Sequence, residues 1–129
     1  MHLNKDDTEL LAAIKTRIRN NYAEHTNIGQ FALDTGFSIS KLSRSFRYIY
    51  GINLYHFIKT VRMYESLPLL LENRKSLSQV AKAVGYRSSG NFITAFRKHY
   101  KYTPYYLRTH PTLLLTIQKR TYKQFQHLL

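Results

Sequence analysis

Two short stretches of the chain combine basic and small polar side chains at the spacing of a helix face. The first carries Ser40, Lys41, Ser43, Arg44 and Arg47, and the second carries Ser89, Gly90, Asn91, Thr94, Arg97 and Lys98. Neither stretch contains an acid. An arginine fork can hold O6 and N7 of guanine, and small polar side chains fit the edges of other bases. A helix with such a face has the chemistry that the major groove of DNA accepts.

The net charge also indicates an anionic partner. The 129 residues include 20 Lys or Arg and seven Asp or Glu, which gives +13 at pH 7 with neutral histidines. The last 57 residues, from Asn73 onwards, contain 11 Lys or Arg and no acid. Such a surface repels itself unless an anion lies near it. Nucleic acid is the commonest partner for this pattern, an anionic membrane surface is the second, and a charge that serves only solubility is the third.

The residues that other chemistry needs are missing. Without cysteine the chain has no disulfide, thiolate zinc site or cysteine nucleophile, as is common in a reducing compartment. GxGxxG, phosphate-loop and HExxH motifs are absent. The six histidines never stand three or four residues apart, so no helix presents two of them to one metal ion. We therefore expect neither an enzyme nor a metal or other cofactor. Without a signal peptide or a long apolar run, we expect a cytoplasmic protein.

Both polar stretches belong to an internal repeat. Residues 32–37, ALDTGF, match residues 81–86, AKAVGY, at an offset of 49. Four later residues match at an offset of 50: Leu42, Phe46, Arg47 and Tyr50 against Phe92, Phe96, Arg97 and Tyr100. In each copy a small alanine lets two helices cross closely, and a glycine four residues later makes the turn. Each copy is therefore predicted to be a helix-turn-helix motif.

Cap residues and apolar periodicity predict an all-α fold throughout the chain. Seven helices are expected to begin after Asp7 or Thr8, Thr26 or Asn27, Ser38, Asn53, Ser76, Ser88 or Ser89, and Thr103, with an eighth in the tail. We expect a frayed leader at 1–7, helix-turn-helix subdomains at 8–52 and 76–108, a linker helix at 53–75 and a C-terminal extension at 109–129. Pro68 should kink or divide the linker helix, because proline lacks a backbone donor and clashes with the preceding turn.

The expected linker helix has a length that suits duplex DNA. About 20 residues give about 30 Å of helix, close to the roughly 34 Å between major-groove positions one turn apart. One chain can therefore place both polar helices in successive major-groove segments without a dimer. Apolar residues in the tail, such as Leu114 and Ile117, are expected to pack back on the domain, with an oligomer or partner surface as the alternative.

Taken in order, these residues resemble the DNA-binding domain of the AraC/XylS family of bacterial transcription regulators. The likeness extends over about residues 14–108. It rests on Ala32, Gly36-Phe37-Ser38, Leu42, Arg44, Phe46-Arg47, Gly51, Arg62, Val80-Ala81, Gly85-Tyr86, Ser88, Phe92, Phe96-Arg97-Lys98, Thr103-Pro104 and Arg108. The resemblance implies two helix-turn-helix subdomains, a rigid linker helix and sequence-specific promoter binding that recruits or regulates RNA polymerase. It leaves open a stand-alone regulator or a piece of a longer chain.

The resemblance also assigns roles to the polar stretches. It implies base contacts from Ser40, Ser43, Arg44, Ser89, Gly90, Asn91 and Thr94, and phosphate contacts from Lys41, Arg47, Arg97 and Lys98. Thr94 stands where the family often has arginine, so the second helix is expected to discriminate less between bases. Lys101 replaces the usual glycine, and a left-handed lysine there would cost on the order of 1 kcal/mol. A basic structural or RNA-binding protein without base readout and a membrane-surface module are the alternatives.

Overall fold

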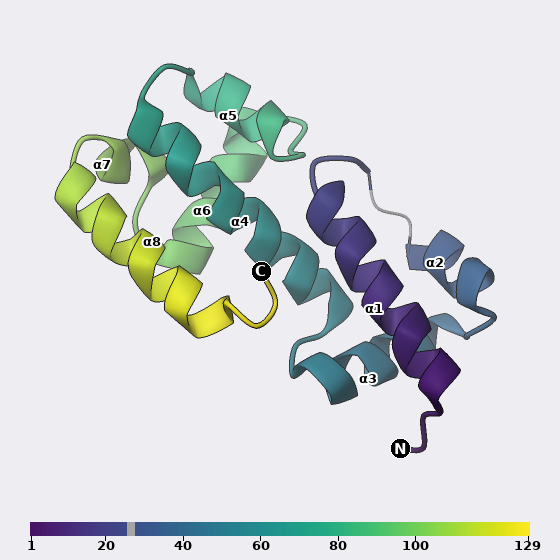
Figure 1. Cartoon of the computed structure of the whole chain (residues 1–129). Helices are drawn as coiled ribbons and strands as arrows, with labels where there is room; N and C mark the ends of the chain where they lie inside the picture. The colour runs from purple at the N-terminus through teal and green to yellow at the C-terminus, as the bar shows by residue number, and fades with distance from the viewer. Residues whose placement is uncertain (26–27) are drawn as a thin grey trace.

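The computed structural model describes residues 1–25 and 28–129, and this part of the chain folds into eight α-helices without a strand (Figure 1). In chain order they are α1 (Lys5–Asn20), α2 (Ile28–Thr35), α3 (Ile39–Tyr50), α4 (Leu54–Glu72), α5 (Leu77–Ala83), α6 (Ser89–Tyr100), α7 (Pro104–Arg108) and α8 (Pro111–Phe125). The predicted all-α class and the additional C-terminal helix are confirmed.

The start of α1 differs from the prediction. Asn4 caps the helix: its side chain accepts a hydrogen bond from the Asp7 amide at 2.8 Å, and the Asp7 carboxylate accepts one from the Asn4 amide at 3.2 Å. This reciprocal pair satisfies two amides that a helix start otherwise leaves free. Asp7 and Thr8 therefore lie inside the helix, and residues 4–7 are not a frayed leader. Leu3, ahead of the cap, packs against the core.

The other described helix starts agree with the sequence. Ser38, Asn53, Ser76, Ser88 and Thr103 each accept a hydrogen bond from the amide three residues on. The caps predicted for α2, Thr26 or Asn27, lie outside the described residues. At the turns of the repeat, Gly36 and Gly85 have φ of 75° and 98°, a left-handed conformation that glycine adopts without strain.

The linker helix α4 continues through Pro68 as one helix of 19 residues, so Pro68 does not divide it, and the alternative of a kink at Pro68 stays a prediction. The proline removes only the donor to the carbonyl four residues earlier. On either side of it, Leu67 and Leu70 are fully buried in the core and hold the helix in place. Burial of these leucines offsets the one missing hydrogen bond.

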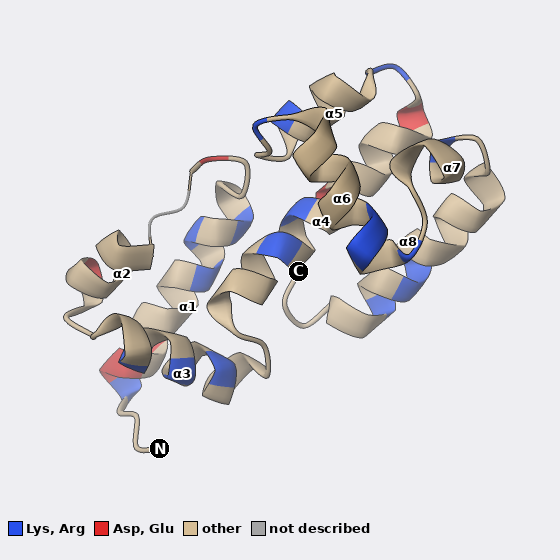
Figure 2. Ribbon diagram, turned by 180° about the vertical axis from the view of Figure 1, so that it is seen from behind, with Lys and Arg blue, Asp and Glu red and all other residues tan. Residues whose placement is uncertain are grey.

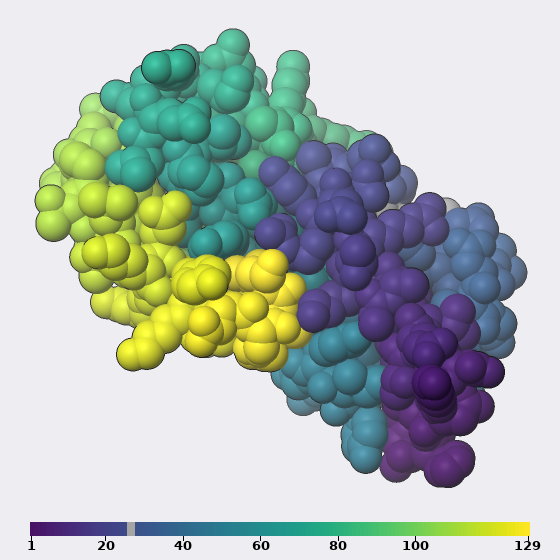
Figure 3. All heavy atoms as spheres, viewed as in Figure 1, coloured from purple at the N-terminus to yellow at the C-terminus, as the bar shows by residue number. Residues whose placement is uncertain are grey.

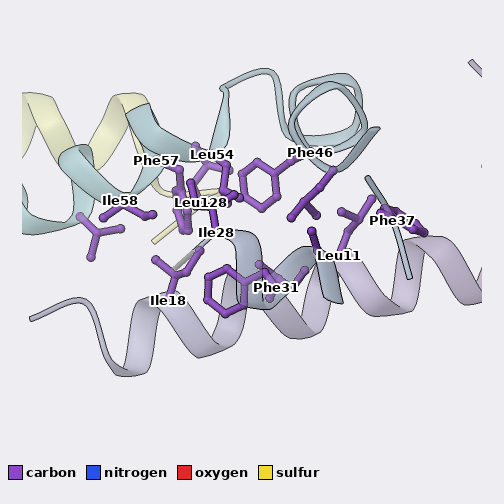
Figure 4. Close-up of a cluster of buried hydrophobic side chains, with 14 residues drawn as sticks. Leu11, Ile18, Ile28, Phe31, Phe37, Phe46, Leu54, Phe57, Ile58 and Leu128 are labelled. Carbon is purple, nitrogen blue, oxygen red and sulfur yellow. The ribbon is translucent and has the colours of Figure 1, made fainter. Parts of the chain in front are cut away.

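Each half of the molecule has its own hydrophobic core, and α4 contributes to both. The first core joins α1, α2 and α3 to the start of α4, from Leu54 to Val61 (Figure 4). The second joins the rest of α4, from Met63 onwards, to the four later helices. The tail helix α8 packs along α4 as expected and buries Leu114 and Ile117 in the second core.

Candidate nucleic-acid interface

The first polar stretch forms the outer face of α3. Leu42 and Phe46 point inward and are fully buried. Ser40, Arg44 and Arg47 are exposed. The spacing i, i+4 and i+7 places these three exposed side chains in one row along the helix. Because the buried pair fixes the rotation of α3, this row faces away from the core.

The second polar stretch forms the outer face of α6 in the same register. Phe92 and Phe96 are fully buried. Gly90, Thr94 and Arg97, which follow Ser40, Arg44 and Arg47 at an offset of 50, are exposed, as are Asn91 and Lys98. Seen from behind, α3 and α6 both lie toward the viewer, and Lys and Arg mark both helices (Figure 2). The structure therefore presents α3 and α6 on one side of the molecule.

Three predicted site residues are less accessible than the rest. Ser43 and Ser89 are half-buried, so their hydroxyls lie at the edge of the exposed rows. Lys41 is also half-buried, with Nζ 4.2 Å from the centre of the Phe37 ring. A cation over a ring face at this distance is attracted by the ring electrons. This contact holds Lys41 beside the turn rather than on the row of Arg44.

The exposed cations of α3 and α6 have no acidic partner in the described part of the chain. Its two ion pairs, Arg17 with Asp34 at 3.4 Å and Arg19 with Glu65 at 3.2 Å, both start from α1. The Arg44 Nε donates only a long hydrogen bond, 3.4 Å, to the Ser40 carbonyl. These guanidinium and ammonium groups are therefore available to an external anion.

Arg62 connects the two motifs. It is among the residues that carry the family resemblance, but the resemblance assigned it no role. From α4, its Nε donates to the Tyr22 carbonyl at 2.8 Å and its Nη2 to the Glu24 carbonyl at 3.0 Å. Its guanidinium carbon lies 5.8 Å from the centre of the Tyr86 ring, and desolvation by burial lowers the Arg62 pKa. A Cβ on Gly85 would lie 2.9 Å from the Ala23 carbonyl oxygen. The turn of the second motif thus packs directly on the loop that follows α1.

Other kinds of site find no support in the described residues. No three His, Cys, Asp or Glu side chains in residues 1–25 and 28–129 gather closely enough to hold a metal ion. None of the helices in those ranges combines the length and apolar character that crossing a membrane requires.

Comparison with known proteins identifies the family of the chain. Residues 19–110 match a family described as a helix-turn-helix domain. The chain belongs to this family, and its helix-turn-helix domain is of the AraC type. The family is one of DNA-binding transcription regulators, which confirms the predicted functional class. The region matched includes α2 to α7 of the AraC-type domain, whereas α8 lies beyond it.

Three relatives illustrate how much of the chain is shared. An HTH-type transcriptional regulator in the cgkA 5′ region of Pseudoalteromonas carrageenovora is 34% identical over 67% of this chain and 51% of its own length. PqrA of Proteus vulgaris, named a probable transcription factor, is 28% identical over 81% of this chain and 84% of its own length. The structure of a DNA-binding transcriptional dual regulator from Escherichia coli K-12 is 26% identical with a TM-score of 0.68, over 81% of this chain and 93% of that one. The AraC-type domain thus spans about half of the first of these relatives and most of the second.

Proposed function

We propose that the chain regulates transcription by binding a specific promoter duplex as a monomer, with α3 and α6 in successive major-groove segments. The observation that carries this proposal is the pair of exposed, acid-free rows that repeat at an offset of 50 residues on α3 and α6, two helices on one side of the molecule. A major groove admits one helix, and two helices on one side of a protein can enter it at two places. Bound there, the regulator would act on RNA polymerase in the bacterial cytoplasm.

On α3, Arg44 is the principal base reader. Its exposed fork can hold guanine O6 and N7 and so distinguish that base pair by about 1–3 kcal/mol. Ser40, and Ser43 at the edge of the row, read neighbouring positions more weakly. Arg47 at the end of the row and Lys41 beside the turn contact phosphates, which fix the register of the protein on the duplex.

On α6, the bases meet smaller side chains. Gly90 offers close approach of the backbone, while Ser89, Asn91 and Thr94 can exchange single hydrogen bonds with base edges. Arg97 and Lys98 contact the phosphates on either side of the groove. This helix therefore contributes more to affinity than to sequence discrimination.

The central experiment selects bound duplexes from a random pool. We expect an enriched motif with two boxes about 10–10.5 base pairs apart, of which the box read by α3 is the more strongly specified. An enriched single box would show that only one of the two helices reads bases, and would refute base contacts by the other. No enrichment, together with equal affinity for RNA, single strands and any duplex, would replace the proposal with a basic protein that does not read bases.

The phosphate contacts are tested through salt. Lys98→Ala should weaken binding to specific and unrelated duplexes alike and reduce the slope of log affinity against log salt by about 1, because one fewer counterion is released. Lys119→Ala, an exposed lysine on α8, is the matched control and should leave the slope unchanged. Equal slopes for the two variants would remove Lys98 from the interface.

A further inference from the structure

The segment that follows α7 belongs to both halves of the molecule. Its helix α8 places Leu114 and Ile117 in the second core, at 1% and 5% exposure. After α8 the chain turns, and Leu128 enters the first core with 2% of its surface exposed. Figure 4 shows Leu128 in the cluster with Leu54 and Phe57 of α4. We name residues 126–129 the strap.

Polar contacts attach the strap to α1. The Lys15 Nζ donates to the His127 carbonyl at 3.2 Å, and the Arg19 Nε donates to the Leu129 carbonyl at 3.3 Å. The same Arg19 pairs through Nη1 with Glu65 of α4 at 3.2 Å. Figure 3 shows the strap, in yellow, lying against α1. Each such contact is weak at a surface, but together they fix where Leu128 enters.

This attachment restricts how the two motifs can move. Besides α4, Tyr22 and the Arg62 contacts, the strap is a further connection between the halves. The Arg62 contacts reach the chain at Tyr22 and Glu24, whereas the strap reaches α1 one to two turns earlier, at Lys15 and Arg19. A rotation of one motif against the other would pull Leu128 out of the first core and expose its side chain to water.

The strap lies away from the proposed DNA-binding side. In Figure 1 α8 and the end of the chain are in front and α6 is behind, and Figure 2 shows the reverse side, with α3 and α6 toward the viewer. The strap also lies beyond residues 19–110, which match the family. Any effect of Leu128 on DNA binding must therefore pass through the positions of α3 and α6.

We propose that Leu128 is a positioning residue: by anchoring the strap in the first core it sets the orientation of α3 relative to α6, and so the spacing of DNA boxes that the protein accepts. The orientation follows from the contacts within the chain. The consequence for box spacing rests on the proposed function.

The orientation can be measured without DNA. Because the chain has no cysteine, Leu33→Cys on α2 and Lys82→Cys on α5 place two spin labels at exposed, corresponding positions of the repeat. In the protein that carries only these two labels, pulsed electron paramagnetic resonance should give a narrow distribution of the distance between them. Leu128→Ala should broaden it, whereas His127→Ala, which removes an exposed side chain of the same strap, should not. An equally narrow distribution with Leu128→Ala would overturn the proposal.

The DNA consequence uses the selected two-box duplex and versions with one or two base pairs inserted between the boxes. For the unmodified protein and for His127→Ala, insertion should weaken binding about tenfold or more, as for the loss of one base-pair contact. Leu128→Ala should bind the original duplex more weakly and lose less on insertion. Equal losses for all three proteins would refute the positioning role, while absence of specific binding by the unmodified protein would refute the proposed function instead.

Circular dichroism at the assay temperature checks that the variants are folded. If Leu128→Ala has lost helix content there, the milder Leu128→Val takes its place, because it removes a single methylene from the same site. The distance distribution and the loss of affinity on insertion are then compared between Leu128→Val and the unmodified protein, with His127→Ala still as the control.

Discussion

The two helix-turn-helix motifs agree in what they bury and differ in what they expose. At an offset of 50 residues, Phe46 corresponds to Phe96 and both are fully buried. The helix ends also correspond, since Gly51 and Lys101 are both left-handed, with φ of 74° and 69°. Both helices therefore end in the same left-handed backbone conformation, although the residue that follows the second helix is not glycine.

On the exposed rows the same offset pairs unlike residues. Arg44 of α3 corresponds to Thr94 of α6, and Ser40 corresponds to Gly90. Arg47, for which we propose a phosphate contact, corresponds to another arginine, Arg97. Packing requires particular residues on the inner face alone, so the outer faces are free to differ. From this difference we expect the first motif to discriminate between base pairs and the second chiefly to contact phosphates. The second motif lies in the part of the chain that has no acid after Glu72.

The largest effect should come from the buried positions, where the motifs are alike. Phe46→Ala and Phe96→Ala should each lower the free energy of unfolding by about 3–5 kcal/mol, because both leave a cavity among aromatic rings. The ring of Phe46 lies 4.7 Å from that of Tyr50, and the ring of Phe96 lies 4.9 Å from that of Tyr100. Urea unfolding followed by circular dichroism measures both losses. A loss below about 1 kcal/mol in either variant would show that the cores are not equivalent.

The next effect should separate the two exposed rows. Arg44→Ala should remove the preference for one base pair, worth about 1–3 kcal/mol, whereas Thr94→Ala should cost about 1 kcal/mol or less, as for a single neutral hydrogen bond. Binding to duplexes that carry all four base pairs at each position of the selected motif measures both.

The converse substitution sharpens the same comparison. Thr94→Arg places the residue of the first motif on the second, and it should create a new preference for guanine in the α6 box. If Arg44→Ala changed the base preference at no position of the motif while Thr94→Ala did, the roles would be reversed: α6 would discriminate between bases and α3 would chiefly contact phosphates.

Most of the fold could be predicted because its determinants are local. Caps such as Ser38 and Ser76, and the i, i+4 spacing of Phe92 and Phe96, act within one helix and can be recognised from neighbouring residues. The start of α1 was misplaced because the apolar period begins only at Leu10, while Asn4 forms its capping box ahead of that period. The outward direction of the two rows follows from the same period, although the contacts of these residues with DNA remain predictions.

Contacts between distant residues could not be predicted in this way. Leu128 enters a core built by residues 67 or more positions earlier in the chain, and no period in the tail distinguishes this leucine from Leu129. The Arg62 contacts with Tyr22 and Glu24 likewise depend on how α4 crosses the loop after α1. Such pairings are set by the assembled fold rather than by local propensity.

A smaller effect should distinguish the two helix ends. Gly51→Ala should destabilise the protein by about 1 kcal/mol, because a Cβ is disfavoured in the left-handed region; no atom within 4 Å would obstruct it. Lys101→Gly should stabilise it by less than about 1 kcal/mol, since relief of strain is opposed by the greater freedom of glycine in the unfolded chain. Thermal unfolding measures both changes. A destabilising Lys101→Gly would mean that the freedom of glycine, together with the lost hydrogen bond from Lys101 Nζ to the Lys98 carbonyl, 3.1 Å, outweighs the strain.

The last effect concerns pH and the pair Ile49 and His99, which also correspond at the offset of 50. Burial, reinforced by the nearby charges of Lys59, His56 and Lys101, lowers the pKa of His99 from 6.5 to about 4. Above pH 6.5 the imidazole is neutral in both states and has no effect. Between pH 6.5 and 4 the unfolded chain takes up a proton that the folded chain refuses, so the free energy of unfolding falls as the pH falls.

We therefore expect a lower melting temperature at pH 5 than at pH 7, and we expect His99→Ile, which gives the second motif the residue of the first, to reduce that difference. Melting curves of both proteins across this range test the expectation, with His127→Ala as the control for an exposed histidine. His127→Ala should keep the full pH dependence. If His99→Ile kept it as well, the dependence would arise elsewhere, and the two helix ends would be alike in this property too.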